Sequence, residues 1–224
     1  MLETRNLSET SVPAQPADAL FQRVLVVITE DWFALSHFRP LLAQLRSLAR
    51  EVVVATRSSG QLGEIEKLGV RPVDLDMRRG SFNPIGQAAA ARSLSDLIDA
   101  ERPDVVHAIS LQPILLTSLA MRRSAHKPQA AVLHITGLGY IAASQTPKAR
   151  LVRFLTFAII RSSLPKSCVW LLAENPDDIA LRLRAAWERL HVRRSFQAPA
   201  LMPTSLARLP RPTTRCHASP MSAD

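Results

Sequence analysis

The strongest constraint on the fold comes from residues 23–56, in which two apolar runs flank a segment with helical spacing. The runs are R-V-L-V-V-I-T and E-V-V-V-A-T, and both are rich in β-branched residues, which favour strands. Strands joined through a helix form a β-α-β unit, since parallel neighbours need a crossover connection. We therefore expect a parallel sheet with the polar loop 29–40 at its carboxyl edge, where open α/β sheets bind ligands.

The same alternation of strand and helix patterns continues along the chain. Expected strands lie at 23–29, 51–56, 70–75, 104–109, 129–136 and 168–173. Expected helices lie at 36–49, 61–68, 84–100, 112–124 and 147–163. Because the strand segments are apolar almost throughout, both faces of the sheet are expected to be buried. The predicted fold class is α/β, a Rossmann-like parallel sheet with helices on both faces, over residues 22–180.

The two ends of the chain depart from this pattern. Residues 1–21 have no apolar core of signal-peptide length and are interpreted as a mobile leader. Residues 181–224 contain 8 Arg, 5 Pro and no Gly, and are interpreted as a disordered, low-complexity basic tail. Two origins stay open for this tail. It is either genuine or the product of a coding frame that shifted near Ala180 in a GC-rich gene. The composition of the tail favours the shifted frame.

Composition excludes several classes of function. The tail holds 8 of the 28 basic residues but only 2 of the 19 acidic ones, so most of the net charge of +9 lies outside the domain. Since no basic cluster is interleaved with aromatics, we expect no nucleic acid partner. Cys168 and Cys216 are too few for a disulfide framework or a zinc site, which favours a cytoplasmic setting. No apolar run reaches the roughly 18 residues of a spanning helix, so membrane contact would be peripheral.

The loop 29–40 offers the first candidate binding residues. Ser36, His37 and Arg39 stand beside Glu30 and Asp31, a set that could bind a polar or phosphorylated ligand. Ser36 would cap the following helix, whose free amides could face an anion. The alternative is that Ser36 is only a cap and that both carboxylates are solvated. The absence of a G-x-G-x-x-G sequence disfavours a dinucleotide site.

Five motifs together resemble a known family. They are E-D-W-F-A-L-S-H-F-R-P-L, R-G-S-F-N-P, P-D-V-V-H-A-I-S-L-Q-P-I-L, T-G-L-G-Y and E-N-P-D-D. Their order and spacing resemble the N-terminal domain of family-4 glycosyltransferases over residues 23–178. The nearest subgroup looks like the bacterial enzymes that extend undecaprenyl-diphosphate-linked sugars.

This resemblance implies a GT-B fold, in which two Rossmann-like domains face each other across a cleft. It implies transfer of a hexose with retained anomeric configuration, a nucleotide sugar as donor, a lipid-linked saccharide as acceptor, and no cofactor. The N-terminal domain of such enzymes mainly holds the acceptor. No metal is expected, and the histidines and cysteines show no H-x-H or C-x-x-C spacing.

The resemblance also implies that further residues belong to the binding site. His107 matches a position that the family places near the donor sugar, although a histidine in an apolar strand is commonly structural. Gly137 and Gly139 would contact acceptor or donor through their amides, or else form only a tight turn. Arg79, Ser81 and Asn83 would contact the acceptor phosphate.

One basic segment suggests a membrane surface. An apolar stretch within residues 147–166 is surrounded by cations, a pattern typical of a helix on an anionic lipid surface. The cations are Lys148, Arg150, Arg153, Arg161 and Lys166. A buried core helix with cationic ends explains the pattern equally well.

Length separates the candidate functions. A complete two-domain enzyme of this kind needs roughly 350 to 400 residues, whereas this chain has 224. The first hypothesis is the acceptor-binding domain of a glycosyltransferase. The second is a truncated, non-catalytic binding module that lacks the donor-binding half, and a third is an unrelated Rossmann-like regulator. We expect no transfer by this chain alone.

Overall fold

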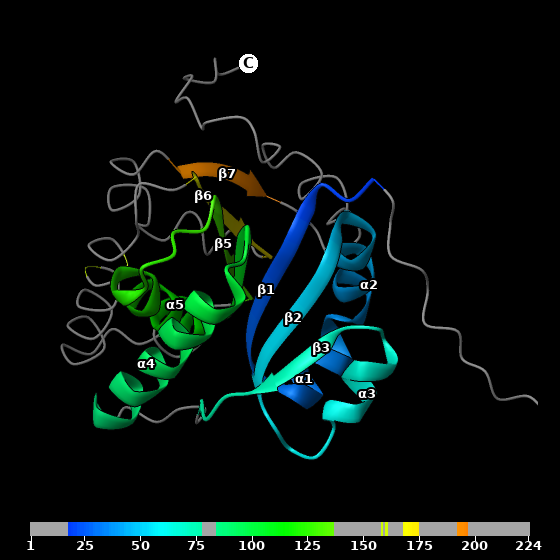
Figure 1. Cartoon of the computed structure of the whole chain (residues 1–224), viewed down its shortest axis with the longest axis horizontal. Coiled ribbons are helices and arrows are strands. Elements are labelled where there is room, and N and C mark those ends of the chain that lie inside the picture. Colours follow the sequence, from blue (N-terminus) through cyan, green and yellow to red (C-terminus); the bar gives the residue numbers. More distant parts are fainter. Residues whose placement is uncertain are drawn as a thin grey trace, which may run out of the picture.

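The computed structural model describes residues 18–77, 84–136, 158, 160, 168–174 and 192–196. These residues form a seven-stranded sheet in the order β3-β2-β1-β4-β5-β6-β7, with every neighbouring pair parallel (Figure 1). The strands are β1 (Phe21–Glu30), β2 (Ala49–Arg57), β3 (Arg71–Asp74), β4 (Val105–Ile109), β5 (Ala130–Ile135), β6 (Cys168–Ala173) and β7 (Val192–Phe196).

Helices cover both faces of the sheet, which confirms the predicted α/β Rossmann-like class. They are α1 (Asp31–His37), α2 (Arg39–Leu48), α3 (Leu62–Lys67), α4 (Pro84–Glu101) and α5 (Leu111–Arg123). Helices α1, α2 and α3 pack on one face, and α4 and α5 pack on the other (Figure 1). Along β1, Val24 and Val26 face the first group, whereas Leu25 and Val27 face the second. Central strands buried on both sides explain the unbroken apolar runs in the sequence.

Most predicted elements are present, with ends that differ by one or two residues. Gly69 follows Leu68, the C-cap of α3, with a φ of +73°, a conformation that favours glycine. Pro84 is the first residue of α4, where its missing N–H costs nothing. The expected helix 147–163 lies outside the described residues except for Ala158 and Ile160, which are helical.

Two features differ from the sequence prediction. Strand β7 pairs with β6, although it lies within residues 181–224, for which the sequence predicts coil. The expected single helix 36–49 is replaced by α1 and α2, which meet at Phe38. Pro40 accounts for this break, because it has no N–H to donate to the carbonyl of Ser36 and so cannot extend α1.

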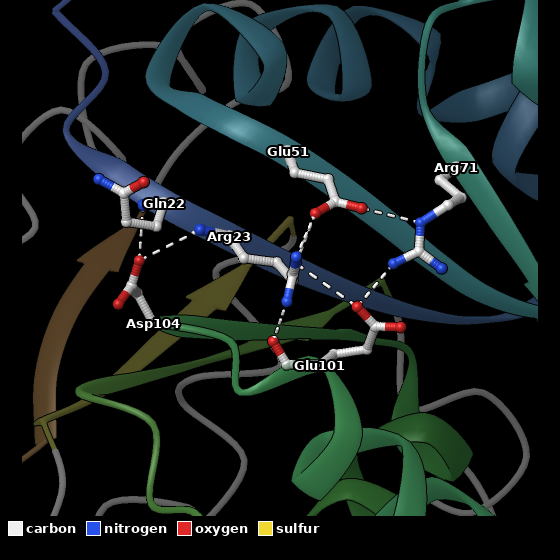
Figure 2. Close-up of polar contacts among 6 residues, drawn as sticks. All are labelled: Gln22, Arg23, Glu51, Arg71, Glu101 and Asp104. Carbon is white, nitrogen blue, oxygen red and sulfur yellow. Dashed lines mark hydrogen bonds and ion pairs between the residues drawn. The ribbon is translucent and has the colours of Figure 1, made fainter.

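A network of ion pairs ties the amino edge of the sheet together (Figure 2). Arg23 on β1 binds Glu51 on β2, with Nη2 2.5 Å from Oε2. Arg71 on β3 donates to Oε1 of Glu51 at 2.8 Å and to Oε2 of Glu101, the last residue of α4, at 2.6 Å. Asp104 accepts the N–H groups of Gln22 and Arg23 at 2.6 and 3.1 Å. Three strands and one helix are thus held in register at the edge opposite the predicted site.

We expect Glu51→Gln to lower the free energy of unfolding by about 1 kcal/mol, because Glu51 joins two arginines in a partly exposed network. Burial raises the pKa of Glu51, but the arginines outweigh it and hold that pKa below its ordinary 4.5. The stabilisation is therefore present above pH 4.5 and is lost as the pH falls further. Urea denaturation of the variant and the unsubstituted chain, above and below pH 4.5, measures both effects.

The exposed pair Lys67–Glu64 provides the control for this prediction, since Lys67→Gln should leave the free energy of unfolding unchanged. Equal stability of Glu51→Gln and the unsubstituted chain would contradict a stabilising network.

Candidate functional site

The strand order identifies where a ligand site is expected. The chain runs from β1 outward to β2 and β3, then returns to place β4 on the other side of β1. This reversal between β1 and β4 is a topological switch point, and open α/β sheets bind ligands at the carboxyl edge beside it. Helix α1 follows β1 there, and Ser110 followed by α5 comes directly after β4.

Asp31 fixes the corner between β1 and α1. Its side chain is fully buried and accepts N–H groups from Trp32 at 2.7 Å, Ser59 at 2.7 Å and Gln61 at 2.9 Å, together with the hydroxyl of Ser59. Burial raises the pKa of Asp31, but the hydrogen bonds from Ser59, Gln61 and Trp32 outweigh it and lower the pKa below 3.8. The carboxylate thus joins α1 to the loop that follows β2.

Glu30 is also buried, so the alternative that both carboxylates are solvated is wrong. Its side chain is 8% exposed and pairs with Nη1 of Arg57 at 3.3 Å. Arg57 ends β2, so this pair ties together the carboxyl ends of two neighbouring strands. Glu30 and Asp31 therefore fix the end of β1 and the start of α1, the segment that carries the candidate residues.

Ser36 lies inside α1, which corrects the prediction that it caps the next helix. Phe38 occupies the cap position of α2, since the break caused by Pro40 falls after Ser36. The Ser36 hydroxyl donates instead to the carbonyl of Trp32 at 2.8 Å and lies 2.7 Å from Nδ1 of His37. Both Ser36 and His37 are exposed.

Arg39 stands at the start of α2 with an exposed side chain. Its Nε donates to the carbonyl of Leu35 at 3.0 Å, which holds the guanidinium against the C-terminal end of α1. Ser36 and His37 thus lie at the C-terminal end of α1, and Arg39 follows them at the start of α2.

His107 is buried at the centre of the sheet. It is fully covered in β4, and its ring lies 5.6 Å from that of His134 in β5. Nε2 of His134 lies 3.2 Å from a carboxylate oxygen of Glu174, which follows β6. Within the described part of the chain, neither ring nitrogen of His107 has a hydrogen-bond partner. Burial, and then His134, hold the pKa of His107 well below its ordinary 6.5, so the ring is neutral at pH 7.

Ser110 is a site feature that the sequence prediction missed. It follows β4 with a φ of +79° and ψ of 160°, a conformation that costs a non-glycine residue about 1 to 3 kcal/mol. Its N–H donates to the carbonyl of His134 at 2.8 Å, and its hydroxyl lies 3.0 Å from that of Thr136. No local sequence signal predicts this conformation, because a positive φ is ordinarily expected at glycine and residue 110 is serine.

Five predicted site residues cannot be placed. Arg79, Ser81 and Asn83 lie in residues 78–83, and Gly137 and Gly139 lie in residues 137–150, all outside the described part of the chain. The cations of residues 147–166 also lie outside it.

The described residues include no group of three or more His, Cys, Asp or Glu side chains that could hold a metal ion. One D-x-D sequence, Asp74-Leu75-Asp76, begins at the last residue of β3, and Asp74 accepts the N–H of Ser58 at 2.9 Å. No helix in these ranges is long and apolar enough to cross a bilayer.

Comparison with known proteins identifies a family and similar structures. The sequence profile of Glycosyltransferase Family 4 matches residues 36–164, more than half of the chain. No curated protein matches significantly in sequence.

Three solved structures are similar to this chain at low identity. A glycosyltransferase from Rickettsia africae ESF-5 is 11% identical, with a TM-score of 0.41 over 82% of this chain and 70% of that one. CalG4, the calicheamicin glycosyltransferase, is 12% identical, with a TM-score of 0.45 over 70% of this chain and 49% of that one. MurG from Acinetobacter baumannii is 12% identical, with a TM-score of 0.39 over 83% and 68%.

We expect Asp31→Asn to destabilise the fold by about 3 kcal/mol, since an amide cannot satisfy the donors that surround this buried carboxylate. The amides of Ser59 and Gln61 should then exchange with solvent faster. Urea denaturation and hydrogen exchange measure these effects. Asp74→Asn is the matched control, because the exposed Asp74 accepts one N–H from the same loop and should cost less than about 1 kcal/mol. Unchanged exchange at Ser59 and Gln61 would contradict the role of Asp31.

His107 should make stability depend on pH in the weakly acidic range. Its folded pKa is depressed, so below about pH 6.5 the unfolded chain binds a proton that the folded chain resists. Stability is therefore complete above pH 6.5 and falls by up to about 1.4 kcal/mol per pH unit below it. His107→Leu should flatten this dependence in urea titrations at pH 7.5, 6.5 and 5.5. His37→Gln, at an exposed histidine, should leave it unchanged, and an equal flattening in both variants would refute the assignment.

Proposed function

Because the chain belongs to glycosyltransferase family 4, we propose that this domain binds the acceptor in the transfer of a hexose from a nucleotide sugar. The acceptor is a lipid-linked saccharide of the undecaprenyl-diphosphate type, and the product serves surface polysaccharide or glycan assembly. The nucleotide sugar is a substrate, and the proposal requires no cofactor.

The observation that carries this proposal is the grouping of Ser36, His37 and Arg39 at one end of α1. A hydroxyl, an imidazole and a guanidinium lie together, all exposed, on the segment that follows the strand beside the switch point. A lipid-linked saccharide offers hydroxyls and a diphosphate, which match these donors and acceptors. Glu30 is paired with Arg57, and the Asp31 carboxylate is held by neutral N–H and hydroxyl donors, so neither carboxylate is free to bind the acceptor.

The residues have distinct proposed roles. Arg39 contacts the acceptor diphosphate, and Ser36 and His37 contact sugar hydroxyls. Arg79, Ser81 and Asn83 add phosphate contacts, and the amides of Gly137 and Gly139 line the same cleft. His107 supports this edge from within the sheet, because its full burial leaves no surface for direct contact in the structure described. Catalysis then consists of positioning the acceptor and of stabilising the leaving diphosphate by amides and cations.

A lipid-linked acceptor places the reaction at a membrane. We propose that the domain works on the cytoplasmic face of the cell membrane, with the cations of residues 147–166 toward anionic lipid. The alternative function is a binding module that holds the acceptor without transfer.

Arg39→Ala should weaken acceptor binding about tenfold, the loss expected for one charge-assisted hydrogen bond to phosphate. The probe is undecaprenyl-diphosphate N-acetylglucosamine in nanodiscs of neutral lipid, with binding to the full chain followed by surface plasmon resonance. Arg50→Ala is the control, because Arg50 is exposed near the amino end of β2, away from α1, and should bind normally.

Adding labelled nucleotide sugars to the same samples separates the two functions. Transfer to the lipid-linked sugar supports an enzyme, and binding without transfer supports the binding module. If the unsubstituted chain does not bind the probe, or if both arginine variants lose binding equally, the proposed acceptor site is wrong.

A further inference from the structure

Helix α1 has two different faces. Asp31, Ala34 and Leu35 are buried toward the sheet. The outer face carries Trp32, Phe33, Ser36 and His37. The Trp32 side chain is 38% exposed, one of two large hydrophobic residues exposed in the described part of the chain. An exposed indole offers a large, flat apolar surface that a ligand can contact.

The aromatic rings on this face support one another. Trp32 and Phe33 meet edge to face with ring centroids 5.7 Å apart, and Phe33 lies 4.9 Å from the ring of His37. Phe33 also contacts Phe38, which packs on the buried His134. The exposed rings are therefore anchored to the core through a continuous series of contacts, so their orientation is set before a ligand arrives.

Hydrogen bonds on the same face determine the proton position on His37. The single Ser36 hydroxyl proton is donated to the carbonyl of Trp32 at 2.8 Å. The 2.7 Å contact with Nδ1 of His37 is then a hydrogen bond only if Nδ1 carries a proton and donates to Ser36 Oγ. Neutral His37 consequently has its proton on Nδ1, which leaves Nε2 as an acceptor.

We infer that this outer face of α1 binds a pyranose ring of the acceptor saccharide, with Trp32 against the apolar face of the ring and His37 Nε2 accepting a sugar hydroxyl. The inference rests on the proposed function, which supplies a saccharide as the substrate, and it extends that function to Trp32 and to one tautomer of His37. A pyranose has C–H groups on its faces and hydroxyls around its edge, which matches an aromatic surface bordered by an acceptor. An isoprenoid chain could pack against the rings, but it has no hydroxyl group that could form hydrogen bonds with the polar atoms of Ser36 and His37.

Nuclear magnetic resonance of the full chain tests this inference. The probes are methyl glycosides of glucose, galactose and N-acetylglucosamine, compared with undecaprenyl phosphate, which has no sugar. We expect the Trp32 indole N–H and the His37 ring to shift with a glycoside. Long-range nitrogen–proton spectra of the neutral His37 ring should show the proton on Nδ1.

Substitutions on α1 should then separate the parts of the site. Trp32→Ala should weaken glycoside binding about tenfold, and Trp32→Phe should restore most of it. Ser36→Ala should remove the oxygen that accepts the Nδ1 proton of His37, so that this tautomer is no longer favoured. It should weaken binding about threefold. Ser47→Ala is the matched control, because Ser47 likewise donates to a carbonyl of its own helix, that of Gln44 at 2.8 Å, and should change neither readout.

Two results would overturn the inference. One is glycoside binding that is unchanged by Trp32→Ala, and the other is a response of Trp32 to undecaprenyl phosphate but not to any glycoside. If lipid-linked acceptor still binds through Arg39 in either case, the proposed function stands while the saccharide face of α1 is refuted. If glycosides bind at Trp32 but Arg39→Ala does not weaken acceptor binding, the saccharide face of α1 stands and the proposed acceptor site at Arg39 is refuted.

Discussion

The hydrogen bonds that surround the Asp31 carboxylate determine where the candidate site lies. This buried group accepts donors from α1 and from the loop after β2, so it fixes the direction in which the chain leaves β1. Its negative charge also lies in the first turn of α1, where the helix dipole favours it. Together with the burial of Ala34 and Leu35 against the sheet, this corner fixes the position of α1 at the carboxyl edge. The ion pair between Glu30 and Arg57 holds the adjoining strand ends together.

The two edges of the sheet use polar residues in different ways. At the amino edge, partly exposed arginines and glutamates pair with each other and link β1, β2, β3 and α4 (Figure 2). At the carboxyl edge, the carboxylates are buried as supports, while Ser36, His37 and Arg39 face outward. One edge therefore serves stability, and the other combines a fixed support with exposed groups of several chemistries. Membership of glycosyltransferase family 4 gives those groups a proposed substrate, a saccharide carried on a diphosphate.

Sequence patterns predicted the sheet well but the site unevenly. Apolar β-branched runs located six strands, because segments buried on both faces leave an unbroken signal. The same reasoning grouped Ser36, His37 and Arg39, since they share one connection after a strand. It misassigned Ser36 as a cap, because the effect of Pro40 on the preceding turn was not included. It also left solvation as an alternative for Glu30 and Asp31, since charged residues are seldom buried unless they are paired.

Local order along the chain thus determined the fold class, the parallel direction of the strands and the connection that carries the candidate residues. These properties depend on the periodicity of apolar residues and on the alternation of strands with crossover helices, both of which can be read from a single sequence. Only the tertiary structure decided that Asp31 meets Ser59 and Gln61, that His107 lies against His134, and that Ser110 adopts a positive φ. It also decided that residues 31–37 form a separate helix, whose outer face carries Trp32 and His37. The physical reason is that burial and pairing depend on neighbours brought together from distant strands and loops, which no local pattern encodes.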